Sequence, residues 1–284
     1  MSSIRSLNEE GYNRLNAAGI LDASIDARLL LEHVFDIDRQ YILMHGADEA
    51  DEAMAEKYLK LIDRRSEHIP LQHITGSQEF MGFDFWVNEH VLIPRQDTEC
   101  LVEEAMIETE DGMDVLDMCT GSGCIIISLS KYKNGLNATA VDISEDALEV
   151  ARANADKLDV AVDFYQGDLY KAIEGTGRTY DIIVSNPPYI ASDVIETLME
   201  EVRYHEPRLA LDGDKDGLSF YKRIVEGSTT YLKPGGCLLF EIGYDQGGAV
   251  SAIMEDNGFI DVCVIKDLAG LDRVVKGRKR CLTS

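Results

Sequence analysis

The sequence lacks the basic charge that nucleic-acid-binding proteins normally carry. Its 284 residues include 27 Lys and Arg but 52 Asp and Glu, which gives a net charge of −25 at pH 7. Contacts to phosphates depend on basic groups, so this balance disfavours general nucleic-acid binding, and it also disfavours attachment to anionic membranes. A local basic patch can still bind nucleic acid, so the charge sets an expectation only: no nucleic acid and no membrane as partner.

Paired cysteines and long apolar runs are also missing. The six Cys residues form no C-x-x-C pair, and none stands beside His at zinc-finger spacing, so we expect no metal site. No run approaches the roughly 18 uncharged apolar residues of a membrane span, and the first residues lack the apolar core of a signal peptide. We therefore expect a soluble, cytoplasmic monomer with reduced thiols.

Residues 1–76 are expected to form a helical domain. Apolar residues recur at helical spacing in two clusters, within 29–35 and within 58–62, and few β-branched runs interrupt them. Helices of this length joined by short polar segments predict a small bundle. The pattern leaves two roles open, a substrate-docking domain or a helical addition without activity of its own.

Residues 77–95 are expected to form a β-hairpin linker. Aromatic and polar residues alternate from 77 to 93, Gly82 interrupts them, and Pro94 ends the segment. Asp97, Thr98 and Glu99 then suit the first turn of a helix, where acceptors and negative charge meet free N–H groups.

Residues 96–284 are expected to form one α/β domain. Short apolar segments alternate with helical ones, which predicts a mostly parallel sheet with helices on both faces. A ligand site is then expected at the carboxyl ends of the strands. The expected strands are 113–118, 138–143, 162–168, 180–186, 237–243, 259–265 and 272–277, and the expected helices are 97–109, 124–132, 144–156, 217–231 (closed by 233–236) and 246–257.

The first turn between a strand and a helix of this domain carries a candidate cofactor loop. It reads DMCTGSG over 117–123, and two glycines one residue apart let the backbone approach a ligand closely. Asp142, at the end of the next strand, can accept hydrogen bonds from both hydroxyls of a ribose, so we expect a nucleoside. Ile126 replaces the third glycine of a dinucleotide fingerprint, and no Gly-Lys-Ser/Thr occurs. S-adenosylmethionine carries no phosphate and needs neither; a merely structural tight turn is the alternative.

The most specific motif is Asn186-Pro187-Pro188-Tyr189, at the end of the strand 180–186. Two prolines fix φ and remove two N–H donors, so the backbone is rigid and offers carbonyl acceptors. The Asn186 side chain and the Pro187 carbonyl can hold the two hydrogens of a planar NH2 group and aim its lone pair at a sulfonium methyl. Transfer is then an in-line displacement catalysed by positioning, with Tyr189 supplying a flat face. An ordinary strand-end turn is the alternative, and the upstream loop and Asp142 argue against it.

With these residues the chain resembles the release factor glutamine methyltransferases, the family called PrmC or HemK, from about residue 70 to 280. The NPPY motif alone also occurs in adenine-N6 and some guanine-N2 methyltransferases, and the PLQ, IPR and EP elements narrow the choice. Besides the glycine loop and NPPY, the resemblance rests on PLQHITG (70–76), Phe80, Gly82, IPR (93–95), Thr98-Glu99, Glu206-Pro207, Ala210-Leu211, DGL (216–218), FEIG (240–243), DRVV (272–275) and Gly277-Arg278.

The resemblance implies a class I S-adenosylmethionine-dependent methyltransferase with a Rossmann-like seven-stranded sheet, an N-terminal bundle that docks the substrate, and a hairpin linker. It implies N5-methylation of the glutamine in the Gly-Gly-Gln motif of class I peptide chain release factors, which modulates translation termination, with S-adenosylhomocysteine as product. Arg95 and Glu99 would be pocket-wall or lid residues, or else an ion pair at the helix start. By position, the substrate would be bound by Asn186, Pro187, Pro188 and Tyr189, of which Asn186, Pro187 and Tyr189 would be catalytic, and the cofactor by Cys119, Thr120, Gly121, Ser122, Gly123, Asp142, Leu169 (against the adenine) and Asn186.

The chain departs from the family pattern at three positions. Gln96 and Asp97 stand where the family usually has Pro and Glu, and Cys119 stands where it usually has Gly. Asp97 keeps the acidic group on a shorter side chain, and Cys119 is small, so we expect the loop and the activity to survive.

Two other functions stay open at this point. A DNA or RNA amino-methyltransferase, acting on adenine N6 or guanine N2, would use the same acceptors but would need a basic face and usually a base-recognition insert. The basic cluster at 276–280 is short and suits a solvated C-terminus better. A helical scaffold whose methyltransferase fold merely binds a nucleoside is the non-enzymatic alternative, and the intact NPPY motif argues against it.

Overall fold

The computed structural model describes residues 2–281 and divides into two compact units. One consists of the chain up to Ser77 together with Met199–His205, and the other of Gln78–Leu198 together with the chain from Glu206 onward. Residues 199–205 therefore pack with the N-terminal helices, although they come from the part of the sequence expected to form one α/β domain.

Helices make up the N-terminal unit, as the sequence predicts. They are α1 (Ile4–Ala17), α2 (Ala23–Phe35), α3 (Arg39–His45), α4 (Glu52–Ser66), α5 (Leu71–Thr75) and α9 (Glu200–His205). Side-chain oxygens of Ser3, Asp38 and Asp51 accept hydrogen bonds from N–H groups three residues on, and so begin α1, α3 and α4. The core of this unit contains, among others, Leu7, Leu15, Leu30, Leu31, Tyr58 and Ile62.

A charged side chain, Arg65, is buried in the N-terminal unit. Its Nε donates to Oδ2 of Asp26 at 2.7 Å. Its Nη2 donates to Glu201 of residues 199–205, the segment that returns to this unit from later in the chain. The side chain of Arg65 is only 4% exposed and that of Asp26 only 8%. Buried charges are tolerated when each is paired, so this cluster ties residues 199–205 to α2 and α4.

The second unit begins with the predicted hairpin. Strands β1 (Ser77–Phe80) and β2 (Phe83–Trp86) pair, and Met81 and Gly82 between them have φ values of +50° and +73°. Positive φ at both central positions is typical of the two-residue turns that match the twist of a hairpin. The strands are shorter than the alternation over 77–93 predicts, because residues 87–95 continue without regular structure.

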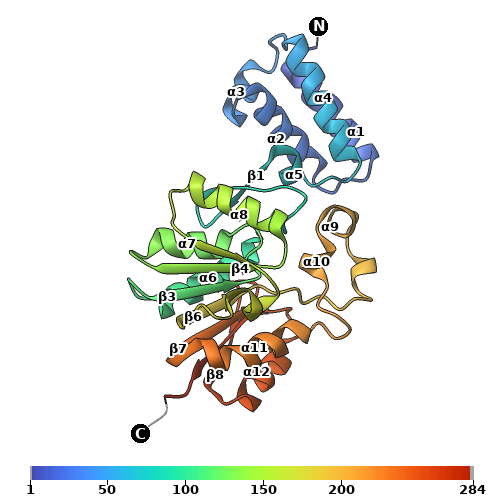
Figure 1. Ribbon diagram of the computed structural model, residues 1–284. Coiled ribbons are helices and arrows are strands. Elements are labelled where there is room, and N and C mark those ends of the chain that lie inside the picture. Colours follow the sequence, from blue (N-terminus) through green and yellow to red (C-terminus); the bar gives the residue numbers. More distant parts are fainter. Residues whose placement is uncertain (1, 282–284) are drawn as a thin grey trace. The chain divides into compact units, whose positions relative to one another are not determined.

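A seven-stranded sheet organises the second unit (Figure 1), which confirms the predicted fold class. Its strand order is β5-β4-β3-β6-β7-β9-β8. Neighbouring strands from β5 to β7 are parallel, and β9 runs antiparallel to both β7 and β8. The strands are β3 (Asp114–Met118), β4 (Asn137–Asp142), β5 (Asp163–Gln166), β6 (Tyr180–Ser185), β7 (Leu232–Glu241), β8 (Phe259–Lys266) and β9 (Asp272–Lys279).

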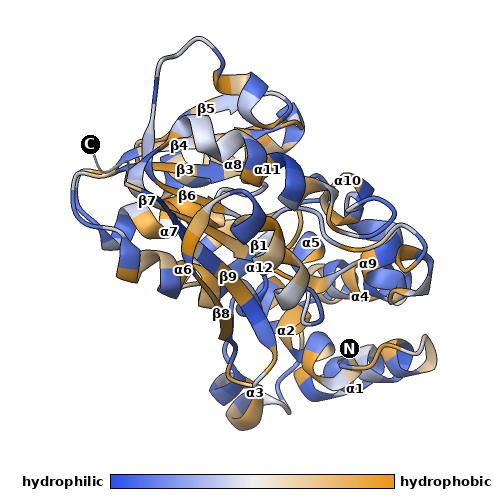
Figure 2. Ribbon diagram, turned by 90° about the horizontal axis from the view of Figure 1, so that it is seen from below, coloured by the Kyte–Doolittle hydropathy of each residue, from blue (hydrophilic) through white to orange (hydrophobic). Residues whose placement is uncertain are grey.

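Helices cover both faces of this sheet. Successive strand residues point to opposite faces, so Val115 packs into a core with α6 and α7, whereas Leu116 packs into a second core with α11 and α12. Figure 2 shows hydrophobic colours concentrated along the strands. No helix among residues 2–281 combines the length and apolar character needed to cross a bilayer. The helices are α6 (Gln96–Glu108), α7 (Cys124–Tyr132), α8 (Glu145–Lys157), α10 (Arg208–Leu211), α11 (Ser219–Tyr231) and α12 (Gly247–Asp256), with 3-10 turns η1 (Leu169–Ile173) and η2 (Ile195–Thr197).

The predicted boundary between the helix 217–231 and the strand after it was wrong. Pro-Gly signals at 233–236 suggested a turn between the helix and a strand starting at 237, but β7 begins at Leu232, directly after α11. Leu232 pairs with Tyr180, and the register then shifts so that Cys237 pairs with Ile182. The extra residues form an irregularity inside the strand, where Gly235 takes a φ of +79°, because a bulge absorbs residues that a sequence pattern assigns to a turn.

Candidate functional site

The loops that follow β3, β4, β5 and β6 line one pocket, at the edge of the sheet where a ligand is expected. The pocket has a volume of about 170 Å³. Gly123, Pro187 and Tyr189 are absent from its lining, although they belong to the same loops. The candidate residues that do line it are Cys119, Thr120, Gly121, Ser122, Asp142, Leu169, Asn186 and Pro188.

The glycine loop leaves β3 in a strained conformation. Cys119 has a φ of +62°, a left-handed conformation that costs a residue with a side chain about 1 kcal/mol. Glycine avoids this cost, which explains physically why Cys119 is an unusual choice here. Burial is the main cause that raises the pKa of the Cys119 thiol well above its usual range, so the thiol stays protonated.

The two glycines of the loop have different surroundings. A Cβ added at Gly121 would meet no atom within 4 Å, whereas a Cβ at Gly123 would lie 2.8 Å from Cδ1 of Ile127 and 3.2 Å from Cβ of Ala151. Gly123 therefore allows α7 and α8 to pack closely, and Gly121 leaves open space beside the pocket that it lines.

Asp142 holds the glycine loop from the end of β4. Its Oδ2 accepts from the backbone N–H of Gly121 at 2.9 Å, and its Oδ1 accepts from that of Ser144 at 2.9 Å. Burial raises the pKa of Asp142, and these hydrogen bonds act in the opposite direction. Each carboxylate oxygen can accept more than one hydrogen bond, so Asp142 can hold the loop and still accept from ligand hydroxyls.

Asp117 lies behind the loop and was given no role from the sequence. Its Oδ2 accepts from the hydroxyl of Thr120 at 2.6 Å, and the residue is fully buried. Burial is the main cause that raises the pKa of Asp117 to about 7. Only its position in the DMCTGSG segment could have indicated that it supports the loop.

The backbone around the NPPY motif is held by Gln246 at the start of α12, by Leu211 at the end of α10, and by the loop before α11. The Gln246 side chain donates to the Tyr189 carbonyl at 3.0 Å, and the N–H of Ile190 donates to the Leu211 carbonyl at 3.0 Å. Side chains at two nearby glycines would not fit, since a Cβ at Gly213 would lie 2.8 Å from Cα of Tyr189, and a Cβ at Gly217 would lie 2.3 Å from its carbonyl oxygen.

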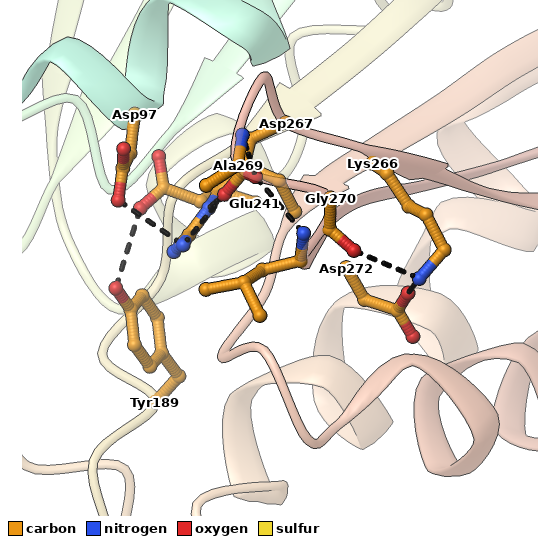
Figure 3. A network of polar contacts seen from close by, with 10 residues as sticks. Asp97, Tyr189, Glu241, Lys266, Asp267, Ala269, Gly270 and Asp272 are labelled. Carbon is orange, nitrogen blue, oxygen red and sulfur yellow. Dashed lines mark hydrogen bonds and ion pairs between the residues drawn. The ribbon is translucent and has the colours of Figure 1, made fainter.

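The side chains of the motif join a buried polar network, and Figure 3 shows its part around Tyr189 and Glu241. Nδ2 of Asn186 donates to Oγ1 of Thr98 at 3.4 Å, and the Tyr189 hydroxyl donates to Oε1 of Glu241 at 3.3 Å. Glu241 ends β7 and is 2% exposed; burial is the main cause that raises its pKa to about 7. Neither Thr98 nor Glu241 was expected in the site from the sequence.

Arg95 and Glu99 have separate partners. Arg95 lines the pocket, and its Nη2 lies 2.5 Å from Oε1 of Glu206, just before α10. Glu99 accepts from the backbone N–H of Met81 in the hairpin turn at 2.7 Å. Arg95 therefore belongs to the pocket wall, and Glu99 braces the hairpin.

A larger hollow, of about 930 Å³, lies at the opposite edge of the sheet. It is lined by residues that begin strands, such as Asp114, Asn137 and Asp163, and by none of the candidate site residues. The smaller pocket is the candidate site because the motifs converge there. Across residues 2–281, no three His, Cys, Asp or Glu side chains gather in a group that could hold a metal ion.

Two protein-family models match the chain. The model of the PrmC N-terminal domain matches residues 7–76, and that of the methyltransferase small domain matches residues 96–214.

Two curated relatives match almost the whole chain. A protein of Clostridium botulinum named release factor glutamine methyltransferase is 44% identical over 280 residues, which cover 97% of this chain and 99% of that protein. A protein of the same name from Geobacter sulfurreducens is 38% identical over 276 residues, which cover 97% and 96% of the two chains. Among solved structures, a methyltransferase from Pyrococcus furiosus has a TM-score of 0.55 at 17% identity and covers 77% of this chain and 98% of its own, a likeness of fold.

Proposed function

We propose, since this chain belongs to the release factor glutamine methyltransferase family, that it transfers a methyl group from S-adenosylmethionine to the side-chain amide nitrogen of a glutamine. The substrate is the glutamine of the Gly-Gly-Gln motif in class I peptide chain release factors. The observation that carries this proposal is the convergence of the glycine loop, Asp142 and Asn186 on one pocket.

The pocket suits S-adenosylmethionine because of the residues that line it. The open side of Gly121 allows close approach to the backbone, Asp142 offers acceptors for ribose hydroxyls, and buried Leu169 offers an apolar wall for the adenine. When bound, the cofactor supplies a methyl group on a sulfonium centre.

The NPPY motif suits an amide substrate. An amide nitrogen is a weak nucleophile because its lone pair is delocalised, and acceptors on both of its hydrogens favour rehybridisation. The Asn186 oxygen and the Pro187 carbonyl would hold these hydrogens and direct the lone pair to the methyl group, while Tyr189 provides a flat face. With the cofactor bound, the new N–C bond would form as the S–C bond broke, and the nitrogen would then lose one proton to solvent. Positioning and fixed dipoles supply the catalysis.

A transfer assay tests the proposed reaction. Purified enzyme receives cofactor with a labelled methyl group and one of three acceptors: a class I release factor, the same factor with the Gly-Gly-Gln glutamine replaced by Ala, or DNA. We expect label on the first acceptor alone. Label on DNA, or equal label on both release factors, would contradict the proposal.

A variant tests the role of Asn186. We expect Asn186→Ala to lower the transfer rate at least about 100-fold, a typical loss for a group that binds the transition state. Asn257→Ala, at the exposed end of α12, is the control and should transfer at the wild-type rate. Near-normal turnover by Asn186→Ala would remove the acceptor argument.

A further inference from the structure

The amide of Asn186 has two orientations of nearly equal shape. One end of an Asn amide only accepts hydrogen bonds and the other end only donates. The proposed reaction needs the oxygen toward the substrate NH2 group, because that group brings hydrogens. A flipped amide would place donor against donor, so the site requires a contact that selects one orientation.

Thr98 provides that contact from the first turn of α6. It accepts from Nδ2 of Asn186 at 3.4 Å, and it is 2% exposed. With the nitrogen engaged there, Oδ1 is the atom left to accept from a substrate in the pocket that Asn186 lines. A hydroxyl both donates and accepts, however, so Thr98 selects the orientation only if its own proton has a fixed place.

Glu241 fixes the proton of Thr98. The hydroxyl of Thr98 lies close enough to the Glu241 carboxylate to lower the pKa of that group, and Oε2 of Glu241 is a buried acceptor that no other group among residues 2–281 satisfies. An ionised carboxylate can only accept, so Thr98 must donate to Glu241 and accept from Asn186. The Tyr189 hydroxyl donates to the same carboxylate at 3.3 Å. Glu241 therefore acts on both ends of the NPPY motif, directly on Tyr189 and through Thr98 on Asn186.

The charges around Glu241 set its protonation. Burial is the largest influence and, with Asp97, it favours the neutral form, whereas Arg273 of β9 favours the ionised form. Arg273 is itself paired with Asp97 and with Asp267, each at 3.1 Å, and Figure 3 shows Asp97 and Tyr189 beside Glu241. Opposing influences of this kind bring the pKa of Glu241 to about 7.

We propose that Thr98 and Glu241 are positioning residues that hold the Asn186 amide oxygen toward the substrate, and that the ionised form of Glu241 is the active one. This inference rests on the proposed function, because it assigns the orientation that methyl transfer to an NH2 group requires. A neutral Glu241 carries a proton of its own and releases Thr98 to donate to Asn186, which allows the amide to flip.

Variants of Thr98 test the hydrogen bond. Thr98→Val removes the hydroxyl at nearly constant volume, and we expect kcat to fall about 10-fold or more with an unchanged dissociation constant for the cofactor. Thr98→Ser keeps the hydroxyl and should stay within about threefold of wild type. Equal activity of Val and Ser variants would overturn the proposal. If Thr98→Val does not fold, Thr98→Ala replaces it in the same comparison.

The pH profile tests Glu241. For the wild type we expect kcat to rise with pH through about 7, as Glu241 becomes ionised. Glu241→Gln should be slower and should lose this rise, whereas Glu226→Gln, on the exposed side of α11, should keep both rate and profile. A rise that persists in Glu241→Gln would overturn the assignment. Absence of transfer by the wild-type enzyme to any release factor would instead refute the proposed function.

Discussion

The Asp142 carboxylate and the Gly121 backbone N–H are joined by a 2.9 Å hydrogen bond, so the residue expected to bind a ribose also fixes the glycine loop that lines the pocket. Asp142→Ala removes both contributions. We expect its dissociation constant for S-adenosylmethionine to rise about 10- to 100-fold, the effect of losing hydrogen bonds to a charged group, measured by titration calorimetry.

The control for Asp142 is Glu149→Ala. Glu149 lies exposed on α8 and does not line the pocket, so its removal changes the local charge but not the pocket wall. An affinity of Asp142→Ala equal to that of the control would exclude the ribose role.

Substitution by alanine should affect the two loop glycines, Gly121 and Gly123, differently. Both have positive φ, so each Ala variant costs about 1 kcal/mol in backbone strain. Gly123→Ala also places a Cβ 2.8 Å from Ile127 and 3.2 Å from Ala151, and we expect it to melt at a clearly lower temperature than Gly121→Ala. Gly121→Ala should keep its fold and bind the cofactor more weakly. Equal melting temperatures would show that helix packing does not depend on Gly123.

Asp117 should make stability depend on pH. Its carboxyl ionises near 3.8 when unfolded and at about 7 when folded, so the folded state binds the extra proton between these values. The free energy of unfolding should therefore fall as pH rises, by roughly 2 to 3 kcal/mol between pH 5 and pH 8 from this group. Asp117→Asn should show a flatter dependence in urea unfolding. The same slope in variant and wild type would contradict the buried pKa.

The Arg65 cluster should matter to the N-terminal unit more than a surface ion pair does. Asp26→Ala leaves a buried guanidinium short of its main partner, and we expect a loss of about 3 to 5 kcal/mol, seen as faster hydrogen exchange in α2 and α4. Glu201→Gln is the matched control, because Glu201 is 31% exposed and its loss should cost less. Equal losses in the two variants would show that the buried contact of Arg65 with Asp26 stabilises the unit no more than its contact with Glu201 does.

Much of the fold follows from short-range patterns. Apolar runs such as 180–185 predict buried parallel strands, and Ser144 predicts the start of α8, where its side chain accepts from the Ala147 N–H at 3.2 Å. The glycine loop and the NPPY motif are also local, so the sequence reveals them directly. Their convergence on one pocket then follows from the rule that parallel strands end at the same edge.

The supporting residues of the site could not be assigned in this way. Thr98, Asn186 and Glu241 lie far apart in the sequence and meet only because α6, β6 and β7 are neighbours in space. Thr98 suits a helix start and Glu241 ends an apolar strand, so each has a sufficient local explanation. The antiparallel place of β9 between β7 and β8 is likewise set by long-range pairing.

The return of residues 199–205 to the N-terminal unit has a consequence for dissecting the protein. The connection between the two units is not a single linker but three passages of the chain, near 77, 198 and 205. A fragment that stops at Ser77 would carry Arg65 without Glu201, and the remaining fragment would carry a helix deprived of its neighbours. Any attempt to express the two halves as independent modules must therefore supply the missing seven-residue stretch, for instance by grafting it onto the shorter piece.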